Sequence, residues 1–539
     1  MHLRPGNAAA PAAIVSSRLL FAPLAALLVL TSACSVTRPG IQPAPRSAFV
    51  PLAEDAPLDR VFAAQRSENP QASGVRLIAQ GSDAFVLRAL TARAAQRSLD
   101  LQYYIWRSDA TGRCLAYEAL LAADRGVRVR LLLDDMDARS RDGLLMALDQ
   151  HPNIEIRLFN PFATRSGALR TLAEMFSRGS RLNHRMHNKA WLADGRVAIV
   201  GGRNVGDEYF AASKTMNFVD LDVLLAGPAV EDAERSFDEY WNSRSAVPIA
   251  HLNRTSRNKR TLADVRTMLA QSMAANAQAD YLRQLDDSPT VDELFADRYA
   301  LTWSTEVHVV ADDPRKAIKR AQDINPGVLQ SIASSLEHAQ HELLLISPYF
   351  VPGVGGTDQL RRKALTGTTV SVLTNSLAAT DVAAVHGGYS RYRKALLQGG
   401  VHLYELKPVP YDDGRGEDGT HERMRLGSSK ASLHTKAAIV DRERIFVGSF
   451  NLDPRSATLN CEMGAWIHDA SLAEELAALF QLGASRRRSF SVTLDADQNL
   501  LWTDEWQGRT RYSHHDPVAS WRRRSITWVL RHLPIESQL

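Results

Sequence analysis

One pattern of residues occurs twice in this 539-residue chain, and it constrains the fold more than any other feature. The first copy reads HNKAWLADGRVAIVGGRN and begins at His187; the second reads HTKAAIVDRERIFVGSFN and begins at His434. Aligned without a gap, the copies lie 434 − 187 = 247 positions apart and share His, Lys, Ala, Asp, Val, Gly and Asn. An internal repeat of this kind predicts two copies of one folded unit rather than a single core.

The segments around the two copies follow the same order of helices and strands. In the first half, hydrophobic spacing predicts a helix over residues 84–95 and strands over 99–106, 127–133 and 154–159. In the second half, it predicts a helix over 328–340 and strands over 342–350, 369–373 and 401–406. We therefore expect an α/β fold of two fused copies of a mixed or mostly parallel sheet flanked by helices.

The spacing within the repeat indicates a β-hairpin that presents polar groups on one face. In His-x-Lys, both side chains point the same way, because strand side chains alternate with period two. Asp194 and Gly195 fall in the turn, and residues 197–200 form the returning strand. If two such hairpins face each other, the active site lies at the interface of the halves and gathers six polar side chains: His187, Lys189, Asn204, His434, Lys436 and Asn451.

This set of side chains suits a phosphodiester. Lysine ammonium and asparagine amide groups donate to phosphoryl oxygens, most strongly where water is excluded. Two histidines can divide the remaining work if one stays neutral as nucleophile and the other stays protonated as general acid. The scheme needs neither a metal ion nor another cofactor. A metal site would use His184, His187 and Asp194, but the second copy has no counterpart of His184, and Lys189 would repel a cation.

The two copies of His-x-Lys-x4-Asp, each followed by Gly-Gly/Ser-x-Asn, resemble the paired signature of the phospholipase D superfamily. Neighbouring stretches, QYYIW (102–106), RGVRVRLLLDD (125–135) and NSLAATD (375–381), are similar to its bacterial cardiolipin synthase C-like branch. The resemblance extends from about residue 72 to about residue 490.

The resemblance implies a role for each motif residue. His187 corresponds to the nucleophile that forms a phosphohistidine, and His434 to the general acid. The phosphate is bound by Lys189, Lys436, Asn204 and Asn451. Asp194 and Asp441 complete the catalytic motif, where we expect them to hold local structure rather than touch substrate. The acidic residues that orient the histidines correspond to Asp220 and Glu462, both in apolar runs that require a hydrogen-bonded partner.

The function implied is phosphatidyl transfer, most specifically cardiolipin synthesis. The expected substrates are phospholipids such as phosphatidylglycerol and phosphatidylethanolamine, with the membrane surface as partner and no obligatory nucleic acid. Three alternatives stay open: a phospholipase D that hydrolyses phospholipids to phosphatidic acid, a metal-independent nuclease, and a non-enzymatic lipoprotein scaffold. Fold and motif alone do not decide among substrates.

Three aromatic and imidazole side chains have two interpretations each. Tyr104 and Tyr349 either border the pocket or are half-buried strand residues. His386 either lines the acceptor pocket or is structural, and we leave it out of the catalytic set.

Composition and charge add limits. With 45% hydrophobic and 23% charged residues, the chain is neither disordered nor a polytopic membrane protein. The net charge of +4 means that an electropositive site must be local. We divide the chain into a tether (35–71), a first phospholipase D-like domain (72–250), a helical connector (251–322) and a second domain (323–490), between the terminal segments described next.

Residues 1–34 are expected to be an export signal. The apolar run 19–30 has the length of a signal-peptide core and follows Arg4 and Arg18. The residues before Cys34 resemble the lipobox of bacterial lipoproteins, with Thr31 in the place that usually holds Leu. Lipidation at Cys34 is therefore one outcome, and ordinary cleavage or an uncleaved anchor are the others. We expect an exported, membrane-associated protein at the periplasmic face.

The basic, tryptophan-containing segment 491–539 ends in an amphipathic helix. Residues Ile526, Val529, Leu530 and Leu533 share one helical face. Beside them lie four arginines and two tryptophans: Arg522, Arg523, Arg524, Arg531, Trp521 and Trp528. This helix either contacts a membrane with its apolar face or packs that face against the domain.

Overall fold

The structure of the protein is a computed structural model, which describes residues 45–50, 56–61, 63–162, 182–252, 260–277, 279–286, 300–318, 327–408, 430–534 and 536–539. The predicted export signal and Cys34 lie outside these ranges, as do parts of the tether and of the connector.

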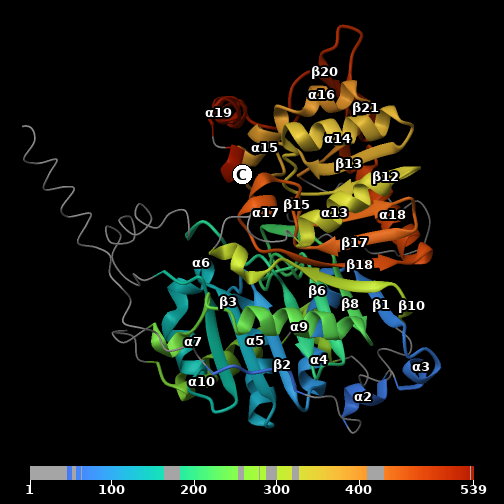
Figure 1. The fold of residues 1–539 in the computed structure, drawn as a ribbon. Coiled ribbons are helices and arrows are strands. Elements are labelled where there is room, and N and C mark those ends of the chain that lie inside the picture. The colour runs from blue at the N-terminus through green and yellow to red at the C-terminus, as the bar shows by residue number, and fades with distance from the viewer. Residues whose placement is uncertain are drawn as a thin grey trace, which may run out of the picture. The chain divides into compact units, whose positions relative to one another are not determined.

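Each half of the chain forms one large sheet (Figure 1). The first sheet has nine strands in the order β10 (Thr302–Ser304), β1 (Ser73–Ile78), β8 (Asp222–Ala226), β6 (Val197–Gly201), β5 (Ala190–Ala193), β2 (Ser98–Tyr103), β3 (Arg128–Asp134), β4 (Ile154–Phe159) and β9 (Ala246–Pro248). The second has ten, in the order β11 (Val307–Ala311), β18 (Met463–His468), β17 (Arg444–Gly448), β16 (Ala437–Val440), β12 (Glu342–Ile346), β13 (Thr369–Asn375), β14 (His402–Leu406), β19 (Ser489–Leu494), β20 (Leu500–Trp506) and β21 (Arg509–Ser513).

Both sheets are mixed, and the parallel part of each is a group of three strands. In the first sheet β2, β3 and β4 run parallel; in the second, β12, β13 and β14 do. The other neighbouring strands in these sheets pair antiparallel, and among them are the hairpins β5–β6 and β16–β17 formed by the repeated motif. The α/β class with two fused, mixed sheets is confirmed, but the sheets are less parallel than the helix–strand alternation suggested.

Helices cover the sheets. The longer ones in the first half are α4 (Gly81–Ala94), α5 (Ala110–Asp124), α7 (Asp142–Leu148), α9 (Ala229–Trp241), α10 (Leu262–Asn276) and α11 (Asp280–Asp286). Those in the second half are α13 (Gly327–His338), α14 (Gly353–Leu365), α15 (Ala383–Ser390), α18 (Ala470–Ala484) and α19 (Trp521–Arg531). Short helices are α2 (Pro57–Val61), α3 (Ala63–Glu68), α6 (Asp135–Ala138), α16 (Arg393–Gln398), α17 (Pro454–Thr458) and the 3₁₀ turns η2 (Arg139–Arg141), η3 (Ile249–His251), η5 (Pro314–Ala317) and η7 (Glu536–Gln538). Among the helices in the described ranges, none combines the length and hydrophobicity needed to cross a bilayer.

A hydrophobic core joins the two halves. Strands β6 and β8 of the first sheet contact β17 and β18 of the second. Val200 and Leu225 share one buried cluster with Ile445, Val447 and Ile467, whereas two further clusters belong to the individual halves. Because the repeated hairpins contribute to this shared core, burial of apolar surface holds the two motif copies against each other.

The connector and the C-terminal segment contribute strands to the sheets. After helices α10 and α11, the connector continues as β10 at the edge of the first sheet and β11 at the edge of the second. The helical expectation for 251–322 left these strands out, although β-branched residues in Val307–Ala311 favour extended structure. Strands β20 and β21 of the C-terminal segment likewise extend the second sheet past β19.

Candidate active site

The turn of each repeated hairpin is fixed by its aspartate. Asp194 and Asp441 adopt left-handed backbone angles, φ 54° and 52°, which aspartate tolerates better than most residues. The buried Asp194 carboxylate accepts hydrogen bonds from the backbone N–H groups of Gln96, Arg97 and Ser98 at 2.8–2.9 Å. Asp441 accepts from three backbone N–H groups in the same way, those of Gln340, His341 and Glu342. Both carboxylates thus tie a turn to the chain segment that precedes a central strand.

The backbone of each half positions the histidine of the other. The His187 N–H donates to the Cys461 carbonyl, and the His434 N–H donates to the Val219 carbonyl, both at 2.8 Å. Around the second contact, β7 (Met216–Val219) pairs parallel with β15 (Lys430–Leu433) as a separate two-stranded sheet. The two motif histidines are therefore placed by strand contacts that cross between the halves.

The carboxylate that contacts each motif histidine also comes from the other half of the chain. His187 Nδ1 lies 2.9 Å from Glu462 Oε2, although Glu462 is in the second half. His434 Nδ1 lies 2.5 Å from Asp220 Oδ2, although Asp220 is in the first half. In each pair Nδ1 donates to a buried carboxylate, which leaves Nε2 as the nitrogen free for chemistry. The structure thus brings together all four of these predicted residues.

The surroundings of the two carboxylates differ at one position of the motif. Ser449 donates its hydroxyl to Glu462 Oε2 at 2.5 Å, so Glu462 shares its charge between a hydroxyl and His187. The aligned residue in the first copy is Gly202, whose missing side chain leaves room for Asp220: a Cβ there would lie 2.2 Å from Asp220 Oδ1. Asp220 accepts instead from the Leu221 N–H and from His434. The pairing of Asp220 with His434 is accordingly the shorter one.

Burial dominates the protonation of both histidines. It lowers the pKa of His187 to about 4, against the opposing charge of Glu462. Burial also lowers the pKa of His434, and Asp220 opposes this shift. Although burial acts in the other direction, the imidazolium of His434 holds the pKa of Asp220 below its ordinary value. His187 is therefore neutral at physiological pH and available as a nucleophile.

The two motif lysines are buried beside the histidines. Each Nζ donates to the carbonyl oxygen of the histidine two residues earlier, Lys189 to His187 and Lys436 to His434. Burial lowers the pKa of Lys189 well below its ordinary value and that of Lys436 to about 8. A bound phosphate would stabilise the charged form of both ammonium groups.

The two motif asparagines line the same cavity but differ in their contacts. Asn204 accepts from the Ile105 N–H at 3.1 Å and donates to the Tyr209 hydroxyl at 2.9 Å. The Oδ1 of Asn451 is buried without a hydrogen-bond partner. Because Oδ1 is an acceptor, the Nδ2 group of Asn451 is the one that can donate to a phosphoryl oxygen.

A polar cavity of about 530 Å³ connects the two motif histidines and the two motif asparagines. Its lining includes residues of both halves: Tyr104, His187, Asn204, Tyr209, Phe218, Tyr349, Asp381, His434, Asn451 and Arg455. Both tyrosines whose role was open, Tyr104 and Tyr349, therefore border the cavity, and the Tyr104 ring lies 5.1 Å from that of His187. His386 lies elsewhere, in a buried cluster with Arg393 and Asp516.

Sequence reasoning did not identify several of the lining residues. The rings of Phe218 and Tyr209 lie 5.0 and 5.3 Å from that of His434 and help to exclude water from it. Phe218 could have been found, because it precedes Asp220 by two residues in an extended run and thus shares its face. Asp381, which accepts from the Tyr349 hydroxyl at 2.7 Å, ends the stretch NSLAATD that resembles the family, but that resemblance gave it no role. Arg455 carries no motif that marks it.

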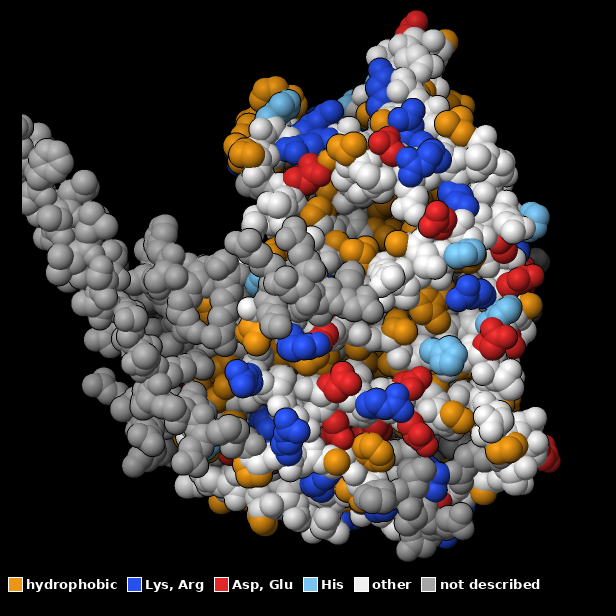
Figure 2. Space-filling model, viewed as in Figure 1, with side chains coloured by type: hydrophobic (Ala, Val, Ile, Leu, Met, Phe, Trp, Pro, Cys, Tyr) orange, Lys and Arg blue, Asp and Glu red, His pale blue; other side chains and the backbone are white. Residues whose placement is uncertain are grey.

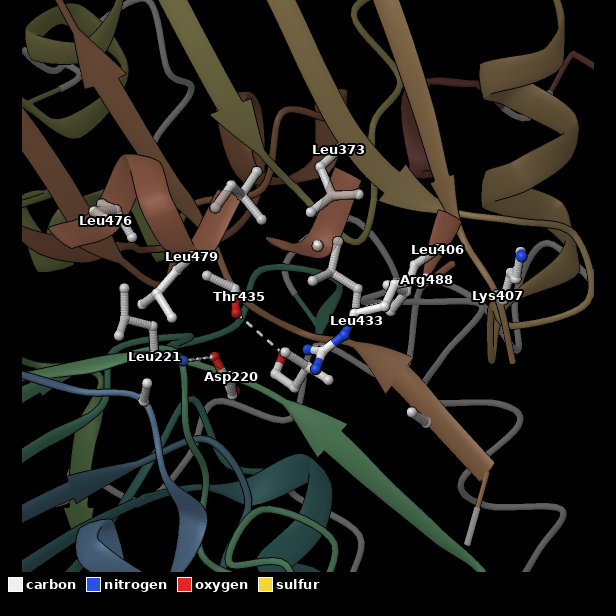
Figure 3. A pocket seen from close by; sticks show the side chains of 15 residues that line it. Asp220, Leu221, Leu373, Leu406, Lys407, Leu433, Thr435, Leu476, Leu479 and Arg488 are labelled. Carbon is white, nitrogen blue, oxygen red and sulfur yellow. Dashed lines mark hydrogen bonds between the residues drawn. The ribbon is translucent and has the colours of Figure 1, made fainter. Parts of the chain in front are cut away.

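A smaller, mainly apolar cavity of about 80 Å³ has Asp220 in its wall (Figure 3). Its walls include leucines from several elements, Leu221, Leu373, Leu406, Leu433, Leu476 and Leu479. This apolar wall helps to keep water from the buried Asp220 carboxylate, which strengthens its interaction with His434.

The residues of the metal alternative do not converge. Asp194 lies at the far end of β5 from His187 and its carboxylate is engaged by the backbone of 96–98. The His184 ring contacts the Leu459 carbonyl at 2.9 Å. Within the described ranges, no group of three or more His, Cys, Asp or Glu side chains is arranged to hold a metal ion.

Comparison with known proteins agrees with this geometry. Residues 90–241 and 332–482 match the family described as cardiolipin synthase, PLD-like domain. The chain is 40% identical to cardiolipin synthase C of Escherichia coli over 87% of its own length and 97% of that protein. It is 32% identical to an uncharacterized protein of Helicobacter pylori, over 78% of this chain and 81% of the other.

A similar fold is found in the crystal structure of phosphatidylserine synthase from Haemophilus influenzae. The two structures superpose with a TM-score of 0.54 at 12% identity, over 88% of this chain and 99% of the other. At this level of identity, the likeness concerns the fold.

Proposed function

The chain belongs to the phospholipase D-like family of cardiolipin synthases, and on this premise we propose that it makes cardiolipin through a phosphohistidine intermediate. The enzyme is a phosphatidyltransferase of the phospholipase D type. The observation that carries the proposed mechanism is the pair of crossed histidine–carboxylate contacts on one cavity.

In the first step, Nε2 of neutral His187 attacks the phosphorus of a phosphatidylglycerol. The bond between phosphorus and the headgroup glycerol oxygen breaks, and His434 gives its Nε2 proton to that oxygen, which releases glycerol. The contact with Asp220 supports this assignment, because the carboxylate opposes the lowering of the His434 pKa by burial.

In the second step, the headgroup hydroxyl of another phosphatidylglycerol gives its proton to His434 Nε2 and attacks phosphorus. The nitrogen–phosphorus bond breaks, His187 is regenerated, and the product is cardiolipin. Lys189, Lys436 and Asn451 stabilise the charge on the phosphoryl oxygens in both steps. The rings of Tyr209 and Phe218 beside His434 keep water from competing with the acceptor.

Two other outcomes of the same chemistry are distinguished by their products. If water takes the place of the acceptor lipid, the product is phosphatidic acid. If the donor is nucleic acid, the enzyme is a nuclease. Phosphatidylethanolamine is a further candidate donor, which would release ethanolamine instead of glycerol.

Purified enzyme incubated with phosphatidylglycerol, with and without phosphatidylethanolamine, tests the proposal. Mass spectrometry is expected to show cardiolipin with the unaltered enzyme, none with His187→Ala, and a strongly reduced amount with His434→Ala. Phosphatidic acid without cardiolipin would show hydrolysis instead, and cleavage of plain DNA without added metal would favour the nuclease.

We also propose that the protein is exported and held at the periplasmic face of a membrane, with Cys34 as the lipidated residue. The apolar run 19–30 followed by small residues and Cys34 supports this placement. Mass spectrometry of the mature N-terminus is expected to find a diacylated Cys34. An unmodified N-terminus at another residue would contradict it.

A further inference from the structure

Helix α19 presents an apolar face outward. Four large hydrophobic side chains on it are more than half exposed: Trp521 (67%), Trp528 (65%), Ile526 (55%) and Val529 (52%). Leu533, just beyond the helix, continues the face at 41%. Figure 2 shows these hydrophobic side chains gathered at one place, beside basic ones, over the position that α19 has in Figure 1.

The opposite side of α19 is fixed to the domain, which sets the direction of this apolar face. Thr527 is buried, and its carbonyl and the Arg531 nitrogen approach Gly387 of α15 so closely that a Cβ there would lie 3.3 Å from each. The Arg523 side chain donates to the Thr380 carbonyl, and Arg391 donates to the Arg531 carbonyl. The outward exposure of the hydrophobic side chains is therefore a feature of the packed structure, because the helix already uses its other side.

The charge on α19 selects an anionic partner. The helix sequence WRRRSITWVLR carries four arginines and no acidic residue. Its two exposed tryptophans have amphipathic rings of the kind enriched at the headgroup boundary of membranes. An apolar face flanked by arginines is the composition of a helix that lies in the plane of an anionic bilayer.

The chain leads from α19 directly to the catalytic cavity. Arg391 donates to the Leu533 carbonyl at 2.7 Å and pairs with Glu536 at 2.8 Å, and Tyr392 donates to the same carboxylate. Residues Gln538 and Leu539 then line the cavity that holds the two histidines. The Arg455 N–H donates to the Leu539 main-chain oxygen at 2.7 Å, which fastens this end of the segment to the cavity wall.

We propose that α19 docks on an anionic phospholipid bilayer through its outward face, and that residues 536–539 form the wall of the catalytic cavity on that docked side. A lipid headgroup then reaches the histidines while the acyl chains of the same lipid stay in the bilayer. The docking depends only on the surface of α19, whereas its purpose rests on the proposed function.

A fluorophore attached to the helix tests docking without requiring turnover. The full chain carries Cys34→Ser, and because Cys114 and Cys461 are buried, an environment-sensitive dye can be placed on Val529→Cys. The matched control is Leu365→Cys at the end of α14, where the leucine side chain is 71% exposed. Helix α14 belongs to the same half of the protein, and its first residue, Gly353, lies near Glu536. The probes are vesicles of phosphatidylglycerol mixed with phosphatidylcholine, and vesicles of phosphatidylcholine alone.

We expect the dye at position 529 to shift to the blue with phosphatidylglycerol-containing vesicles, less with phosphatidylcholine alone, and the dye at 365 to stay unchanged. No shift at 529, or an equal shift at 365, would overturn the proposal. A shift that depends on protein concentration and not on vesicles would also overturn it, because the occupant would then be a second copy of this chain.

A double variant connects docking to catalysis. Ile526→Asp/Val529→Asp is expected to lower kcat/KM for vesicle phosphatidylglycerol at least about tenfold relative to kcat/KM for a monomeric short-chain analogue. Leu365→Asp is expected to leave this ratio unchanged. An unchanged ratio in the double variant would contradict a role of α19 in lipid delivery. If the unaltered enzyme makes no cardiolipin but the dye at position 529 still shifts with the vesicles, the proposed function is contradicted and the docking is not.

Discussion

The exchange of a single residue between the two motif copies, Gly202 for Ser449, distinguishes the two histidines. The Ser449 hydroxyl takes part of the Glu462 charge, whereas Asp220 acts on His434 without a competing hydroxyl. Both histidines are buried to a similar degree, so we propose that this difference in the carboxylates separates their roles. The sequence pattern did not suggest the Ser449 contact, and the assignment of His187 as nucleophile stays a prediction.

The acid side of the pH profile tests this interpretation. Protonation of His187 removes the nucleophile, and because its pKa is lowered to about 4, kcat/KM should fall only as the pH drops to about 4. Ser449→Ala frees Glu462 to stabilise the imidazolium, which raises the pKa of His187 and moves this limb to higher pH. Ser471→Ala, an exposed serine on α18, serves as control. If the acid-side fall of kcat/KM stays at the same pH or moves to lower pH in Ser449→Ala, Ser449 does not weaken the effect of Glu462 on His187.

The role of His434 as general acid predicts a dependence on the leaving group. His434→Ala should lower kcat/KM for phosphatidylglycerol by about 10² to 10⁴. The loss should be much smaller for a phosphatidyl nitrophenyl ester, whose leaving group departs without a proton. His187→Ala should lose both reactions. Equal losses for both donors in His434→Ala would show that this residue does not protonate the leaving group.

At the scale of elements, the hairpins, the helix over 84–95 and strand 154–159 could be predicted because their hydrophobic periods are regular and local. The edge strands β10 and β11 could not, because three- and five-residue strands give too short a pattern beside long helical segments. The sequence of α19 could not decide whether its apolar side is exposed. An amphipathic pattern shows which residues share the apolar side, but not whether that side packs on the protein or points outward.

The motif aspartates fix the turns of the hairpins, so replacing them should lower the stability of the fold rather than the rate of the reaction. Asp194→Ala leaves three backbone N–H groups without their acceptor, which should cost about 3 kcal/mol of unfolding free energy. Asp194→Asn should cost less, because one oxygen is kept. Urea unfolding measures the change, and turnover per folded molecule should remain near that of the unaltered enzyme. Normal stability with lost turnover would instead place Asp194 in the chemistry.

For the whole molecule, the repeat predicted two halves and one shared site, but not that each histidine takes its carboxylate from the other half. These contacts between the halves join residues that are far apart in the sequence. His434 and Asp220 are separated by 214 positions, and His187 and Glu462 by 275. No local pattern carries that information. The shared core of β6, β8, β17 and β18 produces it by fixing the two hairpins against each other.

The central claim is that two halves build one site, in which one histidine carries the phosphatidyl group. Rapid quenching of the enzyme with radiolabelled phosphatidylglycerol, followed by peptide mapping, measures this directly. The account predicts at most one label per chain, on His187, and none in His187→Ala. A label on His434, two labels per chain, or turnover without any phosphohistidine would contradict it.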